Sequence, residues 1–377
     1  MAMSDIGFVR ADLVPAKPAP NRTTGAVAWA QKNLFATPLD TVLTLLGILF
    51  LVWVVPPLFN FFIGHAVGPY GTVEECRALD AGACWAYIYN EMEFFIYGFY
   101  DIPEQWRPNI VFALGALLLV PLLIPKVPFK RANAILFLVV YPIVSYFLLA
   151  GGVFGLTEIP TEKWGGLLVT LIISVVGITL SFPLGIILAL GRQSNLPVIK
   201  TLCIAFIELI RAVPLITILF MASIMLPLFM PQGTTVDKFL RALVGVTLFT
   251  SAYMAEVVRG GLQAIPRGQY EAGASLGLGY WQRMYFIILP QALKHVIPGI
   301  VNNFISLFKD TSLVYIVGMK DLLEAVKTKN DSALEWQSAN TATTGYLFAA
   351  MVFWVFCFSM SRYSMFMERR LNTGYKR

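Results

Sequence analysis

Long apolar stretches constrain the fold of this chain more than any other feature of its sequence. A helix that crosses the hydrocarbon core of a membrane needs about 20 mostly apolar residues. Hydrophobic residues make up 57% of the chain and charged residues 13%, whereas an average soluble protein has roughly 25% charged residues. We therefore predict an all-α, polytopic membrane bundle of about eight transmembrane helices, at 39–63, 108–124, 134–156, 165–190, 200–230, 240–258, 294–318 and 345–366.

Three of these candidate spans are irregular. The second is short and contains Pro121. The fifth is long and has Pro214 and Pro227 within it, and proline removes a backbone hydrogen bond from a helix interior. The seventh is interrupted by the charged pair Lys309 and Asp310.

The distribution of basic residues predicts the orientation of the spans. With the N-terminus in the cytoplasm, the inner segments with their boundary residues hold 17 Lys and Arg residues and the outer segments hold nine. The positive-inside rule then favours a cytoplasmic location for both termini, which eight spans allow. The basic residues form short runs between apolar stretches and no single patch, so the sequence does not predict nucleic-acid binding.

The segment 64–107 is the longest predicted outer loop, and it is acidic, with seven acidic residues against Arg77 and Arg107. It contains Cys76 and Cys84. In an oxidising compartment these two cysteines could form a disulfide, and two unpaired thiols are the alternative.

Sequence motifs for enzymatic chemistry are absent or lack their context. The pair Gly-Lys does not occur, so the chain has no Walker motif, and no H-E-x-x-H zinc motif is present. Residues 273–277 match G-x-S-x-G, but a nucleophile elbow requires a preceding strand, and here a helix-favouring stretch precedes the serine. We therefore predict no catalytic residue, no metal site and no cofactor in this chain.

The predicted cytosolic segment 259–293 carries most of the functional information. Pro266 suits the first turn of a helix, and Gln269 through Leu276 can form a short helix. Gly277 and Gly279 then allow a tight reversal, and a second amphipathic helix is expected to end before Pro290. The predicted product is a helical hairpin whose small residues allow another protein to approach closely.

This segment resembles the EAA loop of ABC importer permeases. The form of that loop is Glu-Ala-Ala, three residues, Gly, nine residues, Ile, one residue, Leu and Pro. The matching residues at that spacing are Glu271, Ala272, Gly277, Ile287, Leu289 and Pro290. Gly273 replaces the third Ala, which we expect to weaken the local helix by about 1 kcal/mol.

Neighbouring stretches resemble the permeases for polar amino acids. They are Glu208–Leu215, Ala252–Gly260 and Lys309–Leu313, and the resemblance covers about 165–367. A three-span extension before a five-span core is similar to the longer permeases of general L-amino acid importers. We therefore expect a cytosolic tail at 1–38, an extension at 39–164 with periplasmic loop 64–107, a permease core at 165–367 with EAA loop 259–293, and a cytosolic tail at 368–377.

The resemblance implies a function in transport and a set of partners. A cytosolic ATPase dimer, which binds ATP and Mg²⁺, would grip the EAA loops of two permease subunits, and a periplasmic binding protein would deliver the amino acid. The second permease would be related but different, and the complex would lie in the bacterial inner membrane. The expected contacts with the ATPase are Glu271, Ala272, Gly273, Gly277, Gly268 and Gln269.

Ionisable residues within spans are costly in lipid and usually face a bundle interior or a cavity. Glu208 and Arg211 are three residues apart and can meet on one helix face, either as a structural ion pair or in the transport path. Asp310 is followed by Thr311 and Ser312, and together they could hold the ammonium group of an amino acid. Anchoring of Lys309 and Asp310 at the membrane interface is the alternative.

A secondary amino acid transporter driven by an ion gradient is the main rival function. Such transporters are often built from two repeated halves with broken spans. No such repeat is visible in the sequence, and the EAA-type loop would have no role. The sequence therefore favours the permease subunit of an ATP-driven importer of polar L-amino acids.

Overall fold

The computed structural model describes residues 25–78, 80–153, 155–231 and 236–371. The predicted tails at 1–38 and 368–377 therefore lie partly outside the described residues. The chain divides into two compact units, Met1–Ala66 and Val67–Arg377.

The described part of the first unit, from residue 25 on, is a long apolar helix with a short helix before it. It contains α1 (Ala26–Asn33), α2 (Pro38–Phe59) and the π-helical turn η1 (Asn60–Gly64). Thr37 begins α2 with a capping box, because its hydroxyl accepts a hydrogen bond from the Asp40 amide at 3.1 Å and the Asp40 carboxylate accepts one from the Thr37 amide at 3.1 Å. A helix that is apolar all round is typical of a membrane span.

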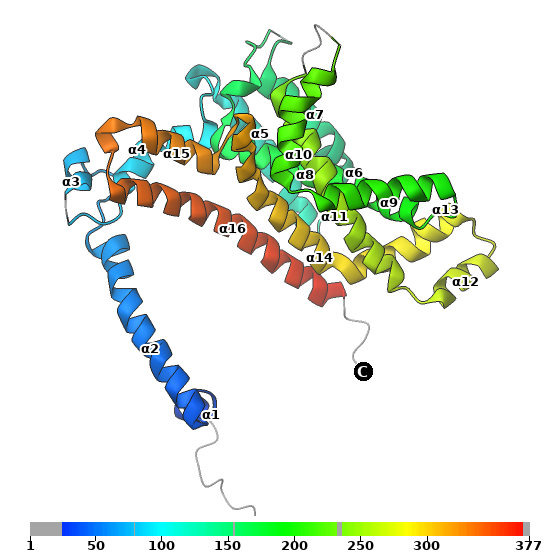
Figure 1. Cartoon of the computed structure of the whole chain (residues 1–377), viewed down its shortest axis with the longest axis horizontal. Helices are drawn as coiled ribbons and strands as arrows, with labels where there is room; N and C mark the ends of the chain where they lie inside the picture. Colours follow the sequence, from blue (N-terminus) through cyan, green and yellow to red (C-terminus); the bar gives the residue numbers. More distant parts are fainter. Residues whose placement is uncertain (1–24, 79, 154, 232–235, 372–377) are drawn as a thin grey trace, which may run out of the picture. The chain divides into compact units, whose positions relative to one another are not determined.

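The second unit is helical apart from one two-residue strand and a few isolated bridges among its described residues. Figure 1 shows its elements in sequence colours. They are α3 (Val73–Arg77), α4 (Trp85–Tyr97), η2 (Ile102–Glu104), α5 (Trp106–Leu123), α6 (Lys130–Ile135), η3 (Leu136–Val140), α7 (Tyr141–Ala150), η4 (Thr161–Lys163), α8 (Gly166–Arg192), α9 (Pro197–Ala212), α10 (Leu215–Phe220), η5 (Met221–Met225), η6 (Leu226–Phe229), α11 (Lys238–Gln263), α12 (Arg267–Ser275), α13 (Tyr280–Arg283), η7 (Met284–Ile288), α14 (Leu289–Asp310), η8 (Thr311–Val317), β1 (Lys320–Asp321), α15 (Leu322–Ser332), η9 (Leu334–Trp336) and α16 (Ala339–Leu371).

The predicted all-α membrane bundle is confirmed. Among the described residues, 7 helices are long and apolar enough to cross a membrane, and a bent helix pair raises the number to 8 if it counts as one span. The continuous spans are Pro38–Gly64, Ile102–Leu123, Lys130–Ala150, Gly166–Arg192, Lys238–Gln263, Tyr280–Val317 and Ala339–Leu371.

The fifth predicted span, 200–230, is not one continuous helix. It consists of α9 and the segment Leu215–Phe229, which are bent by 105° relative to each other. Val213 at the break has an extended backbone with φ −113° and ψ 137°. The cause is Pro214, because its ring disfavours the helical conformation of the residue before it and it cannot donate to the helix ladder.

The centre of the second unit is the contact between α8 and α11, and α11 also packs against α14, which packs against α16. Small residues allow the close approach of α8 and α11. A Cβ atom on Gly185 would lie 2.6 Å from the Met254 Cβ, so only glycine fits there. Such small-residue contacts are a common way for spans to associate without help from the hydrophobic effect.

One end of the second unit is a cap made from segments that are far apart in the sequence. Its apolar core joins Cys84, Tyr87 and Phe95 to Leu322 and Trp336. The Tyr87 hydroxyl donates to Asn330 Oδ1 at 2.8 Å, and Lys329 Nζ lies 2.6 Å from a Glu91 carboxylate oxygen. The cap therefore combines the predicted outer segments 64–107 and 309–344, and it lies at the end of the spans away from α12 and α13 (Figure 1).

Within the cap, Cys76 and Cys84 are joined by a disulfide with a Cα–Cα distance of 5.5 Å. Asp321 lies nearby at the start of α15, and its carboxylate accepts hydrogen bonds from the amides of Leu323 and Glu324 at 3.2 and 3.0 Å. The Asp321 side chain is fully buried, and this burial raises the pKa of its carboxyl to about 6.

Candidate functional site

The hairpin of residues 264–283, called the coupling hairpin after the role that the sequence resemblance leads us to expect, connects α11 to α14 and is the first part of the candidate site. Pro266 precedes α12, and α12 ends at Ser275. Gly277 then adopts a positive φ of 73°, a conformation that strains residues with a side chain. The Gly277 amide donates to the Ala274 carbonyl at 2.9 Å, and the Leu278 amide donates to the Gly273 carbonyl at 3.3 Å. The chain therefore reverses where the sequence predicts.

The hairpin presents most of the predicted contact residues to solvent. Gly268, Gln269, Glu271, Ala272 and Gly277 are exposed. Gln269 also accepts a hydrogen bond from Gln291 Nε2 at 3.0 Å, which ties α12 to the first turn of α14. The exposed face of α12 is therefore held in place by the helix that follows the hairpin.

Gly273 does not lie on that exposed face. It is buried, and a Cβ atom there would lie 2.6 Å from the Cγ of Arg283 and 3.2 Å from the Cδ1 of Ile287. The replacement of the third Ala by Gly therefore lets α13 approach α12 closely, in addition to its effect on helix propensity. The four neighbouring small residues at 272–275 do not form one surface, because Gly273 points inward.

The second hairpin helix does not end before Pro290, contrary to the sequence prediction. It continues from α13 through η7 into α14, whose first turn contains Pro290. A π-helical turn inserts an extra residue into the hydrogen-bond ladder, and this irregularity accommodates the missing amide and the ring of the proline. The hairpin is therefore continuous with the seventh span.

Large exposed apolar side chains lie within the hairpin and in η7, which directly follows it. Leu276, Trp281, Tyr285 and Phe286 have exposed fractions of 74, 71, 71 and 66%. These four side chains were not among the predicted contact residues. The paired aromatics in Tyr280-Trp281 and Tyr285-Phe286 were a signal that could have identified this apolar surface.

A charge cluster joins α8, α9 and α11 near the hairpin. Glu256 on α11 lies at its centre, 2.9 Å from Arg192, 3.6 Å from Arg211 and 2.8 Å from Arg259. Arg192 on α8 also contacts Glu208 on α9, at 2.8 Å. These ion pairs connect α8, α9 and α11 to one another.

The pairing within this cluster differs from the sequence prediction. Glu208 and Arg211 were expected to meet each other on one face of a helix. Instead Glu208 pairs with Arg192, and Arg211 pairs with Glu256 and lies 5.6 Å from the ring centre of Tyr253. The helix crossing brings stronger partners from α8 and α11 than α9 offers along its own surface.

Asp310, Thr311 and Ser312 do not form one ligand site in the structure. The Thr311 hydroxyl donates to the Phe308 carbonyl at 2.9 Å, and the Ser312 hydroxyl donates to the Lys309 carbonyl at 3.0 Å. Both hydroxyls thus complete the end of α14, and Thr311 is fully buried. Asp310 is the last residue of α14. Unlike the two hydroxyls, its carboxylate makes no hydrogen bond to the end of α14 among the described residues.

No group of three or more His, Cys, Asp or Glu side chains that could hold a metal ion occurs among residues 25–78, 80–153, 155–231 and 236–371. The candidate site thus consists of the exposed hairpin, the charge cluster beside it and Asp310.

The C-terminal half of the chain matches a known protein family, and relatives match over most of its length. Residues 181–373 match the family described as "Binding-protein-dependent transport system inner membrane component". The chain is 48% identical over 361 residues to the inner membrane amino-acid ABC transporter permease protein YhdY of Escherichia coli (strain K12), with 96% of this chain and 97% of that protein covered.

Two further relatives differ in how much of this chain they match. The chain is 40% identical to the glutamate/glutamine/aspartate/asparagine transport system permease protein BztC of Rhodobacter capsulatus, covering 99% of this chain and 100% of that protein. It is 36% identical to the probable glutamine ABC transporter permease protein GlnP of Bacillus subtilis (strain 168), covering 52% of this chain and 88% of that protein. The N-terminal region is therefore an addition relative to the shorter permease.

Proposed function

This chain belongs to the binding-protein-dependent transport system inner membrane component family, and we propose that its complex carries polar L-amino acids into the cell. The chain is an inner-membrane permease of an ABC importer, and a separate subunit hydrolyses ATP. The proposal on the cargo is supported by the E. coli, R. capsulatus and B. subtilis relatives. They are, respectively, an amino-acid permease, a glutamate/glutamine/aspartate/asparagine permease and a probable glutamine permease.

The coupling hairpin is the proposed contact with the ATPase. Its exposed face carries Glu271, Ala272 and Gly277, with Leu276 and Trp281 beside them. A short, exposed helix with large apolar side chains beside it offers a surface on which another protein can pack. Exposed aromatic side chains of this kind are enriched at protein–protein interfaces. This exposed face is the single observation that carries the proposed mechanism of coupling.

The charge cluster would transmit movement of the hairpin to the spans. α11 leads directly into the hairpin, and Glu256 ties it to α8 and α9 through Arg192 and Arg211. A force on α12 would therefore move three helices together.

In the proposed topology the hairpin and both termini are cytoplasmic and the cap is periplasmic. The cap meets the binding protein, and a related but different permease forms the other half of the path.

Asp310 is the proposed acidic group on the transport path, placed at the end of α14 beside η8, which packs against α10. Asp310→Asn is expected to lower uptake at least fivefold, because the ammonium group of the cargo loses its carboxylate partner. The ATPase should still assemble, since the hairpin is unchanged. Uptake measured in proteoliposomes, with co-purification of the ATPase, tests both parts, and normal uptake would remove Asp310 from the path.

Reconstitution of the whole complex tests the proposed function. ATP hydrolysis should rise when the binding protein is loaded with a polar L-amino acid, and uptake should require ATP. Glu271→Arg should abolish this stimulation, because it reverses the charge at the proposed interface. Uptake that follows an ion gradient without the ATPase would instead support a secondary transporter.

A further inference from the structure

The turn between α5 and α6, residues 124–129, holds a strained and exposed aromatic residue. Phe129 has φ 58° and ψ 29°, in the left-handed region, and it is the only residue other than glycine with a positive φ in the described part of the chain. A bulky side chain disfavours this conformation. Because the Phe129 side chain is 83% exposed, no packing within the chain offsets the strain, and strain of this kind points to a function.

Local contacts hold the turn in this conformation. Lys130 Nζ donates to the Leu122 carbonyl at 3.1 Å, and Asn133 Nδ2 donates to the Leu118 carbonyl at 2.8 Å, so that α6 is tied to the last turns of α5. The Asn133 amide also donates to the Phe129 carbonyl at 3.0 Å. The neighbouring residues therefore fix the backbone that exposes the Phe129 ring.

The turn is also strongly basic. Lys126, Lys130 and Arg131 lie close to Phe129 in the sequence, and Lys126 and Arg131 are exposed. None of the three cations forms an ion pair with another residue that the structure describes. The sequence has no Asp or Glu at 105–157. Cations without a nearby counter-charge favour an anionic partner.

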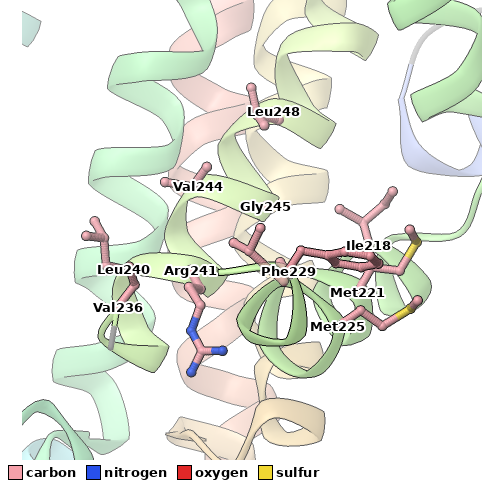
Figure 2. A pocket seen from close by; sticks show the side chains of 12 residues that line it. Ile218, Met221, Met225, Phe229, Val236, Leu240, Arg241, Val244, Gly245 and Leu248 are labelled. Atoms are coloured by element: carbon pink, nitrogen blue, oxygen red, sulfur yellow. The ribbon is translucent and has the colours of Figure 1, made fainter. Parts of the chain in front are cut away.

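A buried arginine near the end of another span shows a different arrangement. Arg241, in the first turn of α11, is 8% exposed and donates to the Ser223 carbonyl. Figure 2 shows its guanidinium directed away from the apolar side chains that line the groove beside it. Arg241 therefore joins α11 to η5, whereas Lys126 and Arg131 are open to a partner from outside the chain.

The position of the turn identifies that partner as the bilayer surface. Residues 124–129 connect two candidate spans, Ile102–Leu123 and Lys130–Ala150. A connection of this length that returns to the membrane reaches no more than about 10 Å from it, so it stays near the headgroups whichever side of the membrane it is on. A protein would have to be brought to this depth, whereas the two spans place lipid there. An aromatic ring beside Lys and Arg at this depth is typical of contact with anionic lipid.

We propose that this turn binds the phosphate headgroup of an anionic phospholipid. Lys126 and Arg131 contact the phosphate, and the Phe129 ring enters the acyl-chain region, where its removal from water offsets the strain of its backbone. Lys130 keeps its hydrogen bond to the Leu122 carbonyl and fixes the turn. The site lies in the N-terminal extension, and the proposal does not depend on the identity of the cargo.

Lipid enrichment beside the turn tests the proposal. Ala132→Cys, at an exposed position of α6, is combined with Cys203→Ser and Cys357→Ser in the full-length protein and labelled with a fluorophore. The protein is placed in nanodiscs of phosphatidylglycerol and phosphatidylcholine in equal amounts, with quenching bromine atoms on the acyl chains of one lipid or the other. Brominated phosphatidylglycerol should quench at least about threefold more, because each cation near an anionic surface raises the affinity roughly fivefold. Equal quenching by the two lipids would overturn the proposal.

Two double variants test the role of the cations. Lys126→Gln with Arg131→Gln should make the two lipids quench equally. Arg362→Gln with Arg369→Gln is the matched control, because it removes two exposed cations from α16 and changes the net charge by the same amount. The control should keep the preference for phosphatidylglycerol. Loss of the preference in both double variants would show an effect of net charge and would contradict a site at the turn.

Phe129→Gly tests the aromatic anchor without a risk to the fold, because glycine adopts a positive φ readily. The unfolding temperature should not fall, whereas quenching by bromine atoms deep in the acyl chains should decrease. Unchanged quenching would refute the insertion of the Phe129 ring. Phosphate and chloride at the same ionic strength should weaken the lipid preference equally, and a stronger effect of phosphate would assign the site to a free anion and overturn the lipid proposal.

Discussion

At the scale of single residues, Glu256 has the most partners of any ionised side chain described. It lies within 4.0 Å of three arginines from three helices. The sequence identified Glu208 and Arg211 as unusual because charges are rare in spans. It could not identify Arg192 as the partner of Glu208, because that pairing depends on how α8 crosses α9.

Glu256→Gln is expected to destabilise the protein by about 2–3 kcal/mol, which is below the loss of 3–5 kcal/mol for one partner of a fully buried pair. The Glu256 side chain is 15% exposed, and its loss leaves three guanidinium groups facing one another. Thermal unfolding of the purified protein measures the change. Glu208→Gln is the control, because Glu208 is 54% exposed and Arg192 keeps Glu256, so a change below about 1 kcal/mol is expected. Equal effects of the two substitutions would refute the central place of Glu256.

Asp321 predicts a pH dependence of stability. Its folded-state pKa of about 6 is above the unfolded value of about 3.9, so the folded protein binds the proton more tightly. The resulting stabilisation is complete below about pH 4 and is lost as the pH rises through 6, and two pKa units correspond to roughly 3 kcal/mol. Asp321→Asn should remove this dependence while keeping an acceptor for the start of α15.

The measurement for Asp321 is the difference in unfolding temperature between the wild type and Asp321→Asn at several pH values. The variant should gain stability relative to the wild type as the pH rises from 4 to 7. A difference that stays constant over this range would show that Asp321 ionises with an ordinary pKa.

At the scale of elements, hydrophobic length predicts the spans well, because lipid imposes the same requirement on every crossing helix. The local breaks were less predictable. Pro214 indicated an irregularity, but the bend of 105° between α9 and the following segment depends on what each half packs against. Pro290 was expected to end a helix, and η7 allows the helix to continue through it. The cap could not be predicted from local sequence patterns either, because it depends on distant contacts. The Cys84 amide, for example, donates to the Thr344 hydroxyl, 260 residues away.

The turn of the coupling hairpin provides a prediction at this scale. Gly277→Ala should strain the turn by about 1–2 kcal/mol, because φ is 73° at this position and a side chain disfavours the left-handed conformation. Amide hydrogen exchange in 270–283 should therefore accelerate, and stimulated ATP hydrolysis should fall.

Gly260→Ala is the matched control for the turn. Gly260 lies in α11, has open space around its Cα and shows no positive φ, so alanine should fit there and favour the helix. If Gly277→Ala exchanged as slowly as the control and kept full stimulation, the geometry of the turn would have no part in coupling.

At the scale of the whole molecule, the second unit carries two different structures at its two ends. The cap, with its disulfide and buried core, lies at one end of α8 and α11, and the coupling hairpin with the charge cluster lies at the other. The candidate site was predictable to the extent that it depends on a local motif, as the hairpin does.

The most direct test of the central claim is the accessibility and cross-linking of position 271 in the assembled importer. In Glu271→Cys with Cys203→Ser and Cys357→Ser, an impermeant thiol reagent should label the new cysteine in inside-out vesicles alone, and a bifunctional reagent should link it to the ATPase. Glu162→Cys, at a side chain 71% exposed near the cap, should be labelled from the opposite side. Labelling of position 271 from the periplasmic side, or an assembled complex without any link to the ATPase, would contradict the account.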